Sequence, residues 1–576
     1  MTLRFIGLSH RGGVGAIASV LVALCPGGAI AQIAGDGTVG TQVNGSLTGT
    51  CTGSCLIEGG TERGVNLYHS FREFSVPTGG TAWFNNAPQI QNILTRVTGL
   101  NPSNIDGLIR ANGTANVFFL NPNGILFGPN ARLQVGGSFF ASTANSFQFA
   151  DGSEFSATNP QAPPLLTVSI TPGLQTGAIA AGATITNRGN LAAPQDLILE
   201  ADRLDAQGNL VAGRDLTLKA QDTLQANDTP LSPLILSAGR TLLVQGDRAI
   251  NLLALSHPDS GLFSGGDMVL RSANPVGGDA HFYAGRSFQI EQLDGSPGNL
   301  FSPNDPIIRS QGDVTFFGYL GASLHILSGG AVNVNQIIIT GPDVVGSSIN
   351  PINTPQLANV VLSDGTALTI DGSARPTVDI RAGMDPAAIG APLGTSGAGF
   401  PTNIFFTPAL GLAAPPINNP VRTSADITIG GVLAGDGQVL MTNQYQPDLQ
   451  LPGGTITING TTGFGLTFGI GVGSATAAGG TIALDARAGI AINGAVAASS
   501  TVANGGSVRL LAQGDITVAP TGVINTSGQT AGGAIAINSR AGGIALNGAV
   551  GSGSPVGNGG TVQLVAQADI TVAPTG

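Results

Sequence analysis

Short alternations of apolar and polar residues recur along the chain, and many of them begin directly after an aspartate. The pattern Asp–apolar–x–apolar starts at seven aspartates: Asp196, Asp215, Asp267, Asp313, Asp426, Asp515 and Asp569. Side chains at i and i+2 of a strand share one face, so each motif predicts a turn followed by a short strand with one apolar face. The 19-residue spacing between Asp196 and Asp215 fits one coil of a solenoid, in which stacked units bury their apolar faces against one another.

The clearest repeat lies at the end of the chain. Residues 478–530 and 531–576 align at an offset of 53 residues with one insertion, and both contain AGG near the start and DITVAPTG near the end. Each copy holds several pairs of apolar residues two positions apart, such as Ile482 and Leu484. We therefore predict two or three coils in each copy.

The first quarter of the chain has a different pattern of apolar segments and turns. Ser103–Phe149 consists of short apolar pieces separated by Asn-Gly, Asn-Pro and Gly-Pro turns, and it is centred on Asn121-Pro122-Asn123-Gly124-Ile125. Upstream, Leu67, Phe71, Phe74 and Val76 are expected to point inward.

One segment departs from the strand pattern. The apolar residues of Ile90–Leu100 fall on one face of a helix, and Gly99 would end it. We predict a short helix there.

Composition supports a structure built from strands and tight turns. The chain has 576 residues, of which 88 are Gly, 42% are hydrophobic and 10% are charged. No collagen-like G-X-Y period is present, and the chain is too apolar to be disordered. No long helical periodicity occurs, so the fold class is all-β. The net charge of −11 and the single lysine, Lys219, argue against a nucleic-acid partner.

The first 31 residues read as a secretory signal. Arg4, His10 and Arg11 form a basic start, and Val14–Leu24 is an apolar run. Ala29-Ile30-Ala31 before Gln32 fits a signal cleavage site between Ala31 and Gln32. A membrane anchor is the alternative, but spanning requires about 20 apolar residues. No later segment is long and apolar enough to span.

Two cysteines follow the signal, Cys51 and Cys55. In an oxidising compartment they are expected to form a small disulfide loop. Half of a metal site is the alternative, but no second pair of Cys or His has matching spacing, so no metal is expected.

Motifs of common catalytic sites are missing from the sequence. No Gly-x-Ser-x-Gly, no Walker-type Gly-Lys-Ser/Thr and no His-Glu-x-x-His occurs, and the five histidines lack ligand spacing. We expect no catalytic residues and no cofactor. A β-helix polysaccharide-active enzyme is the alternative, and it would need two or three carboxylates projecting from adjacent coils.

Four segments in a particular order resemble a known family. NLYHSFREF (Asn66–Phe74), Trp83–Asn86, IDGLIRAN (Ile105–Asn112) and NPNGI (Asn121–Ile125) resemble the filamentous-haemagglutinin-type secretion domain, the haemagglutination activity domain of two-partner secretion exoproteins. The resemblance covers roughly residues 35–175. The NPNL motif of some members is not found, and Ser153–Pro164 is similar to cyanobacterial members.

The resemblance implies a right-handed parallel β-helix with an N-terminal cap, and export through a separate outer-membrane β-barrel transporter. It also makes NPNGI a folding and secretion determinant. Residue chemistry alone leaves NPNGI as a corner of a coil, because Asn-Pro presets a turn and Asn-Gly tolerates positive φ.

These observations predict a domain organisation. The expected order is a signal peptide (1–31), the secretion domain (32–175), β-helix repeats (176–384), a Pro/Ala/Gly-rich excursion (385–420) and further β-helix repeats (421–576).

The predicted function is that of a secreted or cell-surface haemagglutinin-like adhesin, without catalysis, that is exported through the periplasm and binds an unknown receptor or glycan. The alternatives are the polysaccharide-active enzyme and the secretion stub of a longer exoprotein.

Overall fold

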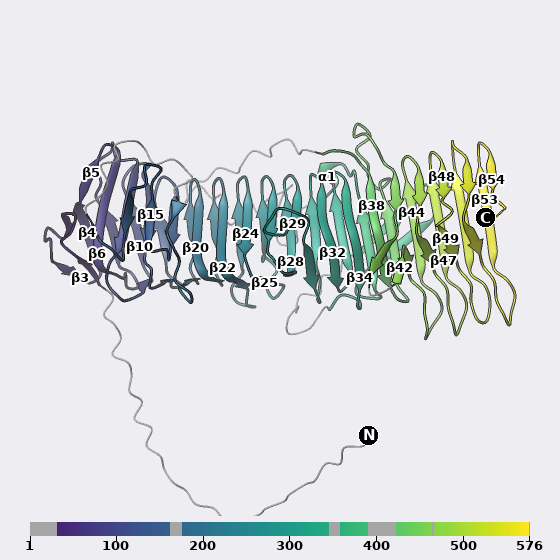
Figure 1. Ribbon diagram of the computed structural model, residues 1–576, viewed down its shortest axis with the longest axis horizontal. Coiled ribbons are helices and arrows are strands. Elements are labelled where there is room, and N and C mark those ends of the chain that lie inside the picture. Colours follow the sequence, from purple (N-terminus) through teal and green to yellow (C-terminus); the bar gives the residue numbers. More distant parts are fainter. Residues whose placement is uncertain (1–31, 162–174, 345–356, 390–421, 464–465, 575–576) are drawn as a thin grey trace, which may run out of the picture.

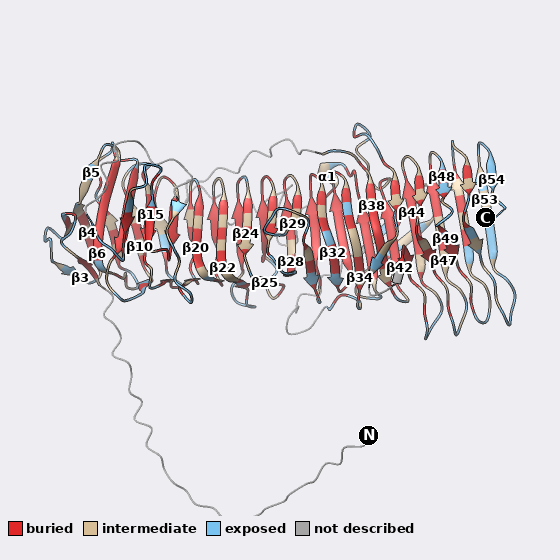
Figure 2. Ribbon diagram, in the orientation of Figure 1, coloured by how far each residue is buried: buried red, intermediate tan, exposed pale blue. Residues whose placement is uncertain are grey.

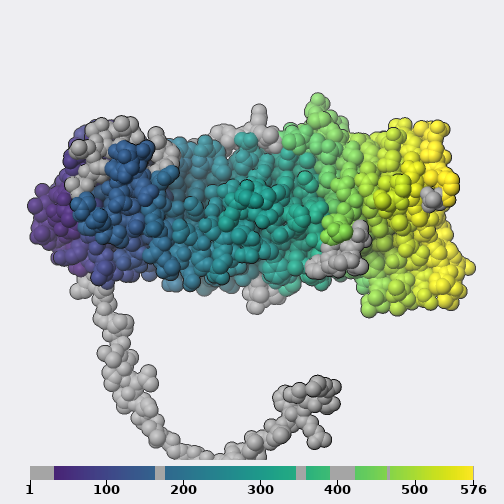
Figure 3. Space-filling view, viewed as in Figure 1, coloured from purple at the N-terminus to yellow at the C-terminus, as the bar shows by residue number. Residues whose placement is uncertain are grey.

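The chain forms a rod of stacked β coils in the computed structural model (Figure 1), which describes residues 32–161, 175–344, 357–389, 422–463 and 466–574. Strands cross the rod, and coils follow one another from the N-terminal end to the C-terminal end in an unbroken series (Figure 3). Nearly all neighbouring coils pair through parallel strands in one 42-stranded sheet. The fold is therefore a parallel β-helix, as the sequence predicted.

Each coil contributes strands to three faces. Residues 197–212 show the plan: β20 (Leu197–Ala206) pairs with β22 (Leu216–Asn227) on the first face, bends after Ala201 and continues pairing with it on the second face. β21 (Leu210–Ala212) then pairs with β23 (Ile235–Ala238) on the third face.

The remaining strands of the first face are, in order, β6 (Asn66–Phe74), β8 (Asn92–Val97), β11 (Asn116–Leu120), β14 (Phe139–Ser142), β24 (Leu242–Gly246), β27 (Met268–Arg271), β29 (Phe288–Glu291), β32 (Val314–Gly321), β34 (Val332–Ile339), β38 (Ile427–Ala434), β40 (Ile456–Ile458), β45 (Ile490–Ile492), β48 (Ile516–Val518), β51 (Ile544–Leu546) and β54 (Ile570–Val572).

The second face contains the later parts of β20, β22, β32, β34 and β38 together with β9 (Ser103–Ile105), β12 (Ile125–Phe127), β18 (Thr184–Asn187), β25 (Ala249–Ala254), β28 (Val276–Ala284), β30 (Asn299–Ser302), β43 (Ile470–Gly471), β46 (Ala495–Ala497), β49 (Val523–Asn525) and β52 (Ala549–Gly551).

The third face contains β4 (Ser54–Gly59), β7 (Thr81–Phe84), β10 (Leu108–Ala111), β13 (Arg132–Gln134), β19 (Leu191–Ala193), β26 (Gly261–Ser264), the end of β28, β31 (Ile307–Ser310), β33 (Leu324–Ser328), β37 (Thr377–Arg381), β39 (Gln438–Thr442), β44 (Thr481–Ala486), β47 (Ser507–Ala512), β50 (Ala534–Ser539) and β53 (Thr561–Ala566).

Smaller elements cover the rod at several points. β1 (Ile33–Gly35), β3 (Thr50–Cys51) and β5 (Thr61–Arg63) form antiparallel pairs that cap the first coil, and β2 (Thr41–Val43) pairs with β4. Three antiparallel units lie outside the coils: β15 (Ser146–Gln148) with β16 (Glu154–Ser156) and β17 (Gln175–Thr176), β35 (Leu357–Val361) with β36 (Ala367–Asp371), and β41 (Thr461–Gly463) with β42 (Leu466–Phe468).

The residue after six of the seven motif aspartates is buried inside the rod, whereas Ile570, after Asp569 in the last coil, is 43% exposed. Leu197, Leu216, Met268, Val314, Ile427 and Ile516 are all 0% exposed and belong to one continuous core. Figure 2 shows this burial along the strands, with exposed residues mostly in loops and in the last coil. Full burial of one such side chain stabilises the fold by about 1.5–3 kcal/mol, so the core is maintained coil by coil.

The motif aspartates recur because their carboxylates join successive coils. Asp215 accepts a hydrogen bond from the Thr241 N–H at 3.0 Å, and Asp313 accepts one from the Ala331 N–H at 2.8 Å. In the C-terminal repeat Asp515 accepts from the Gly543 N–H at 2.8 Å. Each carboxylate thereby satisfies a backbone donor at the start of the following coil.

The 53-residue repeat consists of two coils per copy. Thr481 pairs with Ser507, Ser507 with Ala534, and Ala534 with Thr561, which are steps of 26, 27 and 27 residues. This agrees with the lower of the two predicted coil counts.

The predicted helix at Ile90–Leu100 is wrong, because this segment contains β8. Ile93 and Val97 point into the core, whereas Leu94 points outward and is buried beneath β15–β17 with Phe147. A strand covered on both faces loses the apolar–polar alternation, and its spacing then resembles that of a helix.

The only helix in the described ranges is α1 (Pro386–Ile389), at the start of the predicted excursion. No helix there is long and apolar enough to cross a membrane. Residues 390–420 of the excursion, like the signal peptide with Ala31, lie outside the described residues.

Candidate functional site

The NPNGI segment forms a corner between the first and second faces. β11 ends at Leu120, and β12 begins at Ile125, so Asn121–Gly124 make the whole turn. Gly124 has φ +115°, a conformation that side chains rarely adopt. The segment therefore turns the chain sharply within one coil, as its residue chemistry predicted.

Asn121 is the buried centre of this corner, with 0% exposure. Its Nδ2 donates to the Asn101 carbonyl at 3.1 Å and to Ser103 Oγ at 3.0 Å, both in the preceding coil. Its backbone N–H donates to the Ser142 carbonyl of the following strand at 3.1 Å. Asn121 thus connects the corner to the preceding coil through its side chain and to the following strand through its backbone.

Ile125 is also internal. It is 2% exposed, pairs with Ser103 and Ile185, and packs in the main core. Asn121 and Ile125 are therefore unavailable to a partner in the folded domain.

The outer surface of the corner is small and mostly uncharged. Asn123 is exposed, and its Nδ2 donates to the Gly99 carbonyl at 2.8 Å. Pro122 is half-buried, and the adjacent Leu100 is 89% exposed. The corner therefore presents one apolar side chain and one amide to the solvent.

A buried arginine that was not predicted from the sequence lies near this corner. Arg96 on β8 is 0% exposed, its Nε donates to Ser70 Oγ at 2.9 Å, and its Nη1 donates to the Ser156 carbonyl at 2.8 Å. Nη2 donates to the Gln161 carbonyl at 3.1 Å, and the guanidinium lies 4.3 Å from the Phe155 ring centre. Arg96 therefore fastens the β15–β17 unit to the first face.

Asp36 supplies the compensating charge. Burial alone would raise the pKa of Asp36, but hydrogen bonds from the Ser70, Thr38 and Thr98 hydroxyls outweigh burial and hold that pKa below its usual value. Burial lowers the pKa of Arg96 to about 10, although the negative Asp36 opposes the change. The only sequence signal for this pair was an arginine within the otherwise uncharged run Asn92–Val97.

The remaining predicted residues lie at the N-terminal end of the rod. A disulfide with an S–S distance of 2.07 Å joins Cys51 and Cys55 where β3 meets β4. Both cysteines are buried in the main core. Gln32 is the first described residue, and its carbonyl accepts a hydrogen bond from the Ser75 N–H at 2.8 Å.

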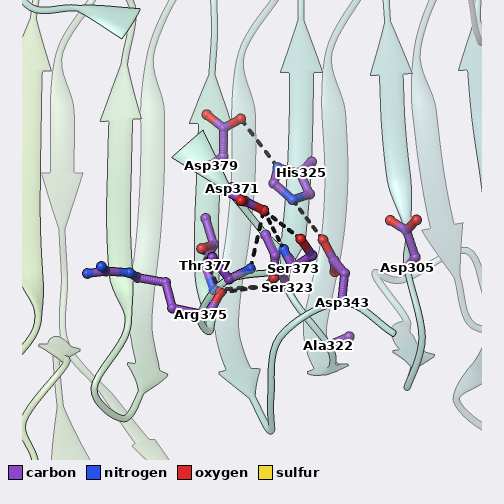
Figure 4. A network of polar contacts seen from close by, with 12 residues as sticks. Asp305, Ala322, Ser323, His325, Asp343, Asp371, Ser373, Arg375, Thr377 and Asp379 are labelled. Atoms are coloured by element: carbon purple, nitrogen blue, oxygen red, sulfur yellow. Dashed lines mark hydrogen bonds and ion pairs between the residues drawn. The ribbon is translucent and has the colours of Figure 1, made fainter. Parts of the chain in front are cut away.

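A second polar cluster lies on the third face, far from NPNGI in the sequence. His325 on β33 lies between two carboxylates, with Nε2 3.3 Å from Asp343 and Nδ1 3.4 Å from Asp379 (Figure 4). Arg381 donates to Asp379 through Nε at 2.9 Å and Nη2 at 2.7 Å. The chain of groups Asp343–His325–Asp379–Arg381 therefore alternates in charge.

The two carboxylates decide the charge of His325. Burial by itself lowers the pKa of His325, but hydrogen bonds and attraction from Asp343 and Asp379 outweigh it and raise the pKa to about 9. Burial raises the pKa of Asp343 to about 6, against the opposing effect of His325. His325 is therefore an imidazolium at neutral pH.

This cluster is closed to substrates. The His325, Asp343 and Asp379 side chains are 0% exposed, and Arg381 is 2% exposed. Asp343 lies in the segment that follows β34, so the cluster attaches this segment to the third face. Among the described residues no group of three or more His, Cys, Asp or Glu is arranged to hold a metal ion.

The corner lies within a stretch of the chain that matches a known family model. Residues 31–280 match the family model of the TPS secretion domain. The crystal structure of the HMW1 secretion domain from Haemophilus influenzae matches with a TM-score of 0.25 and 11% identity, covering 92% of this chain and 98% of that chain. No curated protein matches.

Proposed function

We propose that this chain, a two-partner secretion exoprotein whose residues 31–280 form a TPS secretion domain, presents the NPNGI corner to its transporter during export across the outer membrane. A TPS secretion domain implies interaction with an outer-membrane transporter and export to the cell surface or beyond.

The observation that carries the proposal is that NPNGI contains both buried residues and residues that face the solvent. Asn121 and Ile125 are buried and hold neighbouring coils together, whereas Asn123 faces outward beside the exposed Leu100. The motif thus combines a folding role for its buried residues with a recognition role for its outer surface. The outer surface, formed by Leu100, Pro122 and Asn123, is called the corner surface below.

The test separates the two roles by substitution. Leu100→Ser with Asn123→Ala changes the corner surface, and we expect at least a tenfold loss of secreted protein because the transporter loses its contacts. Asn121→Ala leaves the Asn101 carbonyl and Ser103 hydroxyl without their donor, a loss worth roughly 1–3 kcal/mol, so it also lowers the melting temperature. Secreted protein is measured by immunoblot of the medium and the cell surface, and melting by circular dichroism of purified protein.

Asn130→Ala is the matched control, since Asn130 is another exposed asparagine in a turn of the same coil. A strain lacking the transporter is the negative control for the amount of secreted protein. If as much of the protein reached the surface of that strain as of the wild type, two-partner export would be refuted. Normal secretion of the Leu100/Asn123 variant would refute recognition at the corner surface and leave NPNGI a simple turn.

We further propose that the exported rod acts as an adhesin. The support is its shape: the stack of coils displays three long side-chain surfaces away from the N-terminal cap.

A further inference from the structure

The second face carries a groove in the middle of the rod. It has a volume of about 440 Å³ and runs across five coils, from Asn251 on β25 to Ile338 at the end of β34. Four strand spacings of about 4.8 Å give it a length of about 19 Å. The volume lies within the range of small-ligand sites.

One wall of the groove is a column of outward apolar side chains on successive coils. Phe301 pairs with Leu320, and Leu320 pairs with Ile338, so the three side chains stack along the rod. Phe301 is 43% exposed and Leu320 is 39% exposed. Contiguous exposed apolar side chains are a feature of ligand-binding grooves.

A column of amides and glycines runs beside the apolar stripe. Asn299 pairs with Gly318, and Gly318 pairs with Gln336, each two residues before the apolar position of the same strand. A Cβ atom at Gly318 would lie 2.6 Å from Asn299 Oδ1. Glycine therefore leaves room for the amide and for the hollow between the columns.

Gln336 has an unused donor in this groove. Its Nε2 atom is buried and has no hydrogen-bond partner. Buried polar groups are nearly always paired, and a rotation of this amide toward the groove would let a ligand oxygen accept from it.

The groove is closed at one end and electrically neutral. Beyond Ile338 the hairpin β41–β42 covers Gly431, where a Cβ would lie 2.8 Å from the Phe468 ring. No Asp, Glu, Lys, Arg or His lines the groove. Tyr319 directs its hydroxyl to the Ala322 carbonyl at 2.9 Å and is 2% exposed.

The charge, strand pairing and amide groups of the groove indicate which class of ligand it can bind. The protein carries a net charge of −11, so an anionic polymer would be repelled and would find no cation in the groove. The strands of this face are paired on both sides, so an extended peptide cannot add to the sheet here. Hydroxyl groups both donate and accept, as do the amides of Asn251, Asn299 and Gln336.

We propose that the groove binds an uncharged polysaccharide segment, with the apolar faces of its sugar rings on Phe301, Leu320 and Ile338 and its hydroxyls on the amide column. This assignment rests on the proposed adhesin function and adds to it a binding site and a class of ligand.

The test uses the purified full chain and four neutral hexasaccharides, from β-1,4-glucan, α-1,4-glucan, β-1,4-xylan and β-1,4-mannan, with hexagalacturonate as the anionic comparison. Binding is measured by isothermal titration calorimetry. We expect at least one neutral hexasaccharide to bind and hexagalacturonate not to bind. Phe301→Ala and Gln336→Ala should each weaken binding about tenfold, because they remove the ring platform and the free donor.

Leu231→Ser is the matched control: Leu231 is 95% exposed but lies in the loop between β22 and β23, outside the groove. Phe301 faces solvent, so its truncation leaves the core intact, and circular dichroism verifies the fold. Absence of binding by all four neutral sugars, equal binding of hexagalacturonate, or binding unaffected by both groove variants would each overturn the proposal. The binding measurement needs no transporter. The groove proposal can therefore be refuted while the export proposal stands, and the export proposal can be refuted while sugar binding is observed.

Discussion

At the residue scale, the chain depends on a few buried polar side chains that connect segments distant in sequence. Arg96 reaches Ser156 and Gln161, which lie 60 and 65 residues later. No local pattern announces such a contact, because the partners meet only after the coils have stacked. Asn121 is different, since its turn chemistry could be predicted from its neighbours.

Replacing Arg96 tests its fastening role. We expect Arg96→Met to destabilise the N-terminal coils by roughly 1–3 kcal/mol, since the buried carbonyl of Ser156 loses its hydrogen-bond donor. The measurement is hydrogen exchange of residues 146–161 together with thermal melting. Arg110→Met is the control, because Arg110 also lies over a ring, Trp83, at 4.5 Å but is only half-buried. Equal protection of residues 146–161 in wild type and Arg96→Met would contradict the role.

His325 makes the third face sensitive to pH. Its pKa is raised to about 9 from an ordinary 6.5, so its stabilising contribution is complete below pH 6.5 and is lost as the pH rises to about 9. Protection of the segment around Asp343 against hydrogen exchange, corrected for intrinsic rates, should fall across that window.

His325→Gln should abolish this pH dependence, because glutamine carries no titrating charge. His257→Gln serves as the control, since His257 lies in a loop outside the cluster. A slope that persists in His325→Gln would assign the pH dependence to another group.

At the element scale, the coil is the unit of construction, and its length varies. Leu197 to Leu216 is a step of 19 residues, whereas Leu216 to Leu242 is a step of 26. The aspartate motif located the first-face strands from the sequence because it combines an inward apolar pair with a carboxylate that bonds the next coil.

The pattern failed where a coil is covered from outside. β8 lies under β15–β17, and its outward Leu94 is apolar. The groove on the second face was likewise not predictable, because its columns arise from pairing between coils of unequal length. The His325 cluster required Asp379, 54 residues away.

A deletion tests whether the coil is the unit. Removing residues 507–533, one complete coil, should leave a folded rod, because Thr481 can then pair with Ala534 in the register that it now makes with Ser507. Removing residues 507–519, half of that coil, should expose core side chains and cause proteolysis in the C-terminal repeat. Circular dichroism and limited trypsin digestion measure both outcomes. Equal resistance of the two variants to trypsin would contradict the idea that one complete coil is the unit of construction.

At the scale of the whole molecule, the direction of the hydrogen bonds has a mechanical consequence. The bonds between coils run along the rod, while the chain itself circles it. A pulling force applied to the C-terminal coil therefore peels one coil at a time instead of shearing the whole stack. Each peeled 26-residue coil would release about 85–95 Å of extended chain. If a cell were tethered through this rod, the tether would lengthen under force as coils unfold one by one, and it would shorten again as they refold when the force falls.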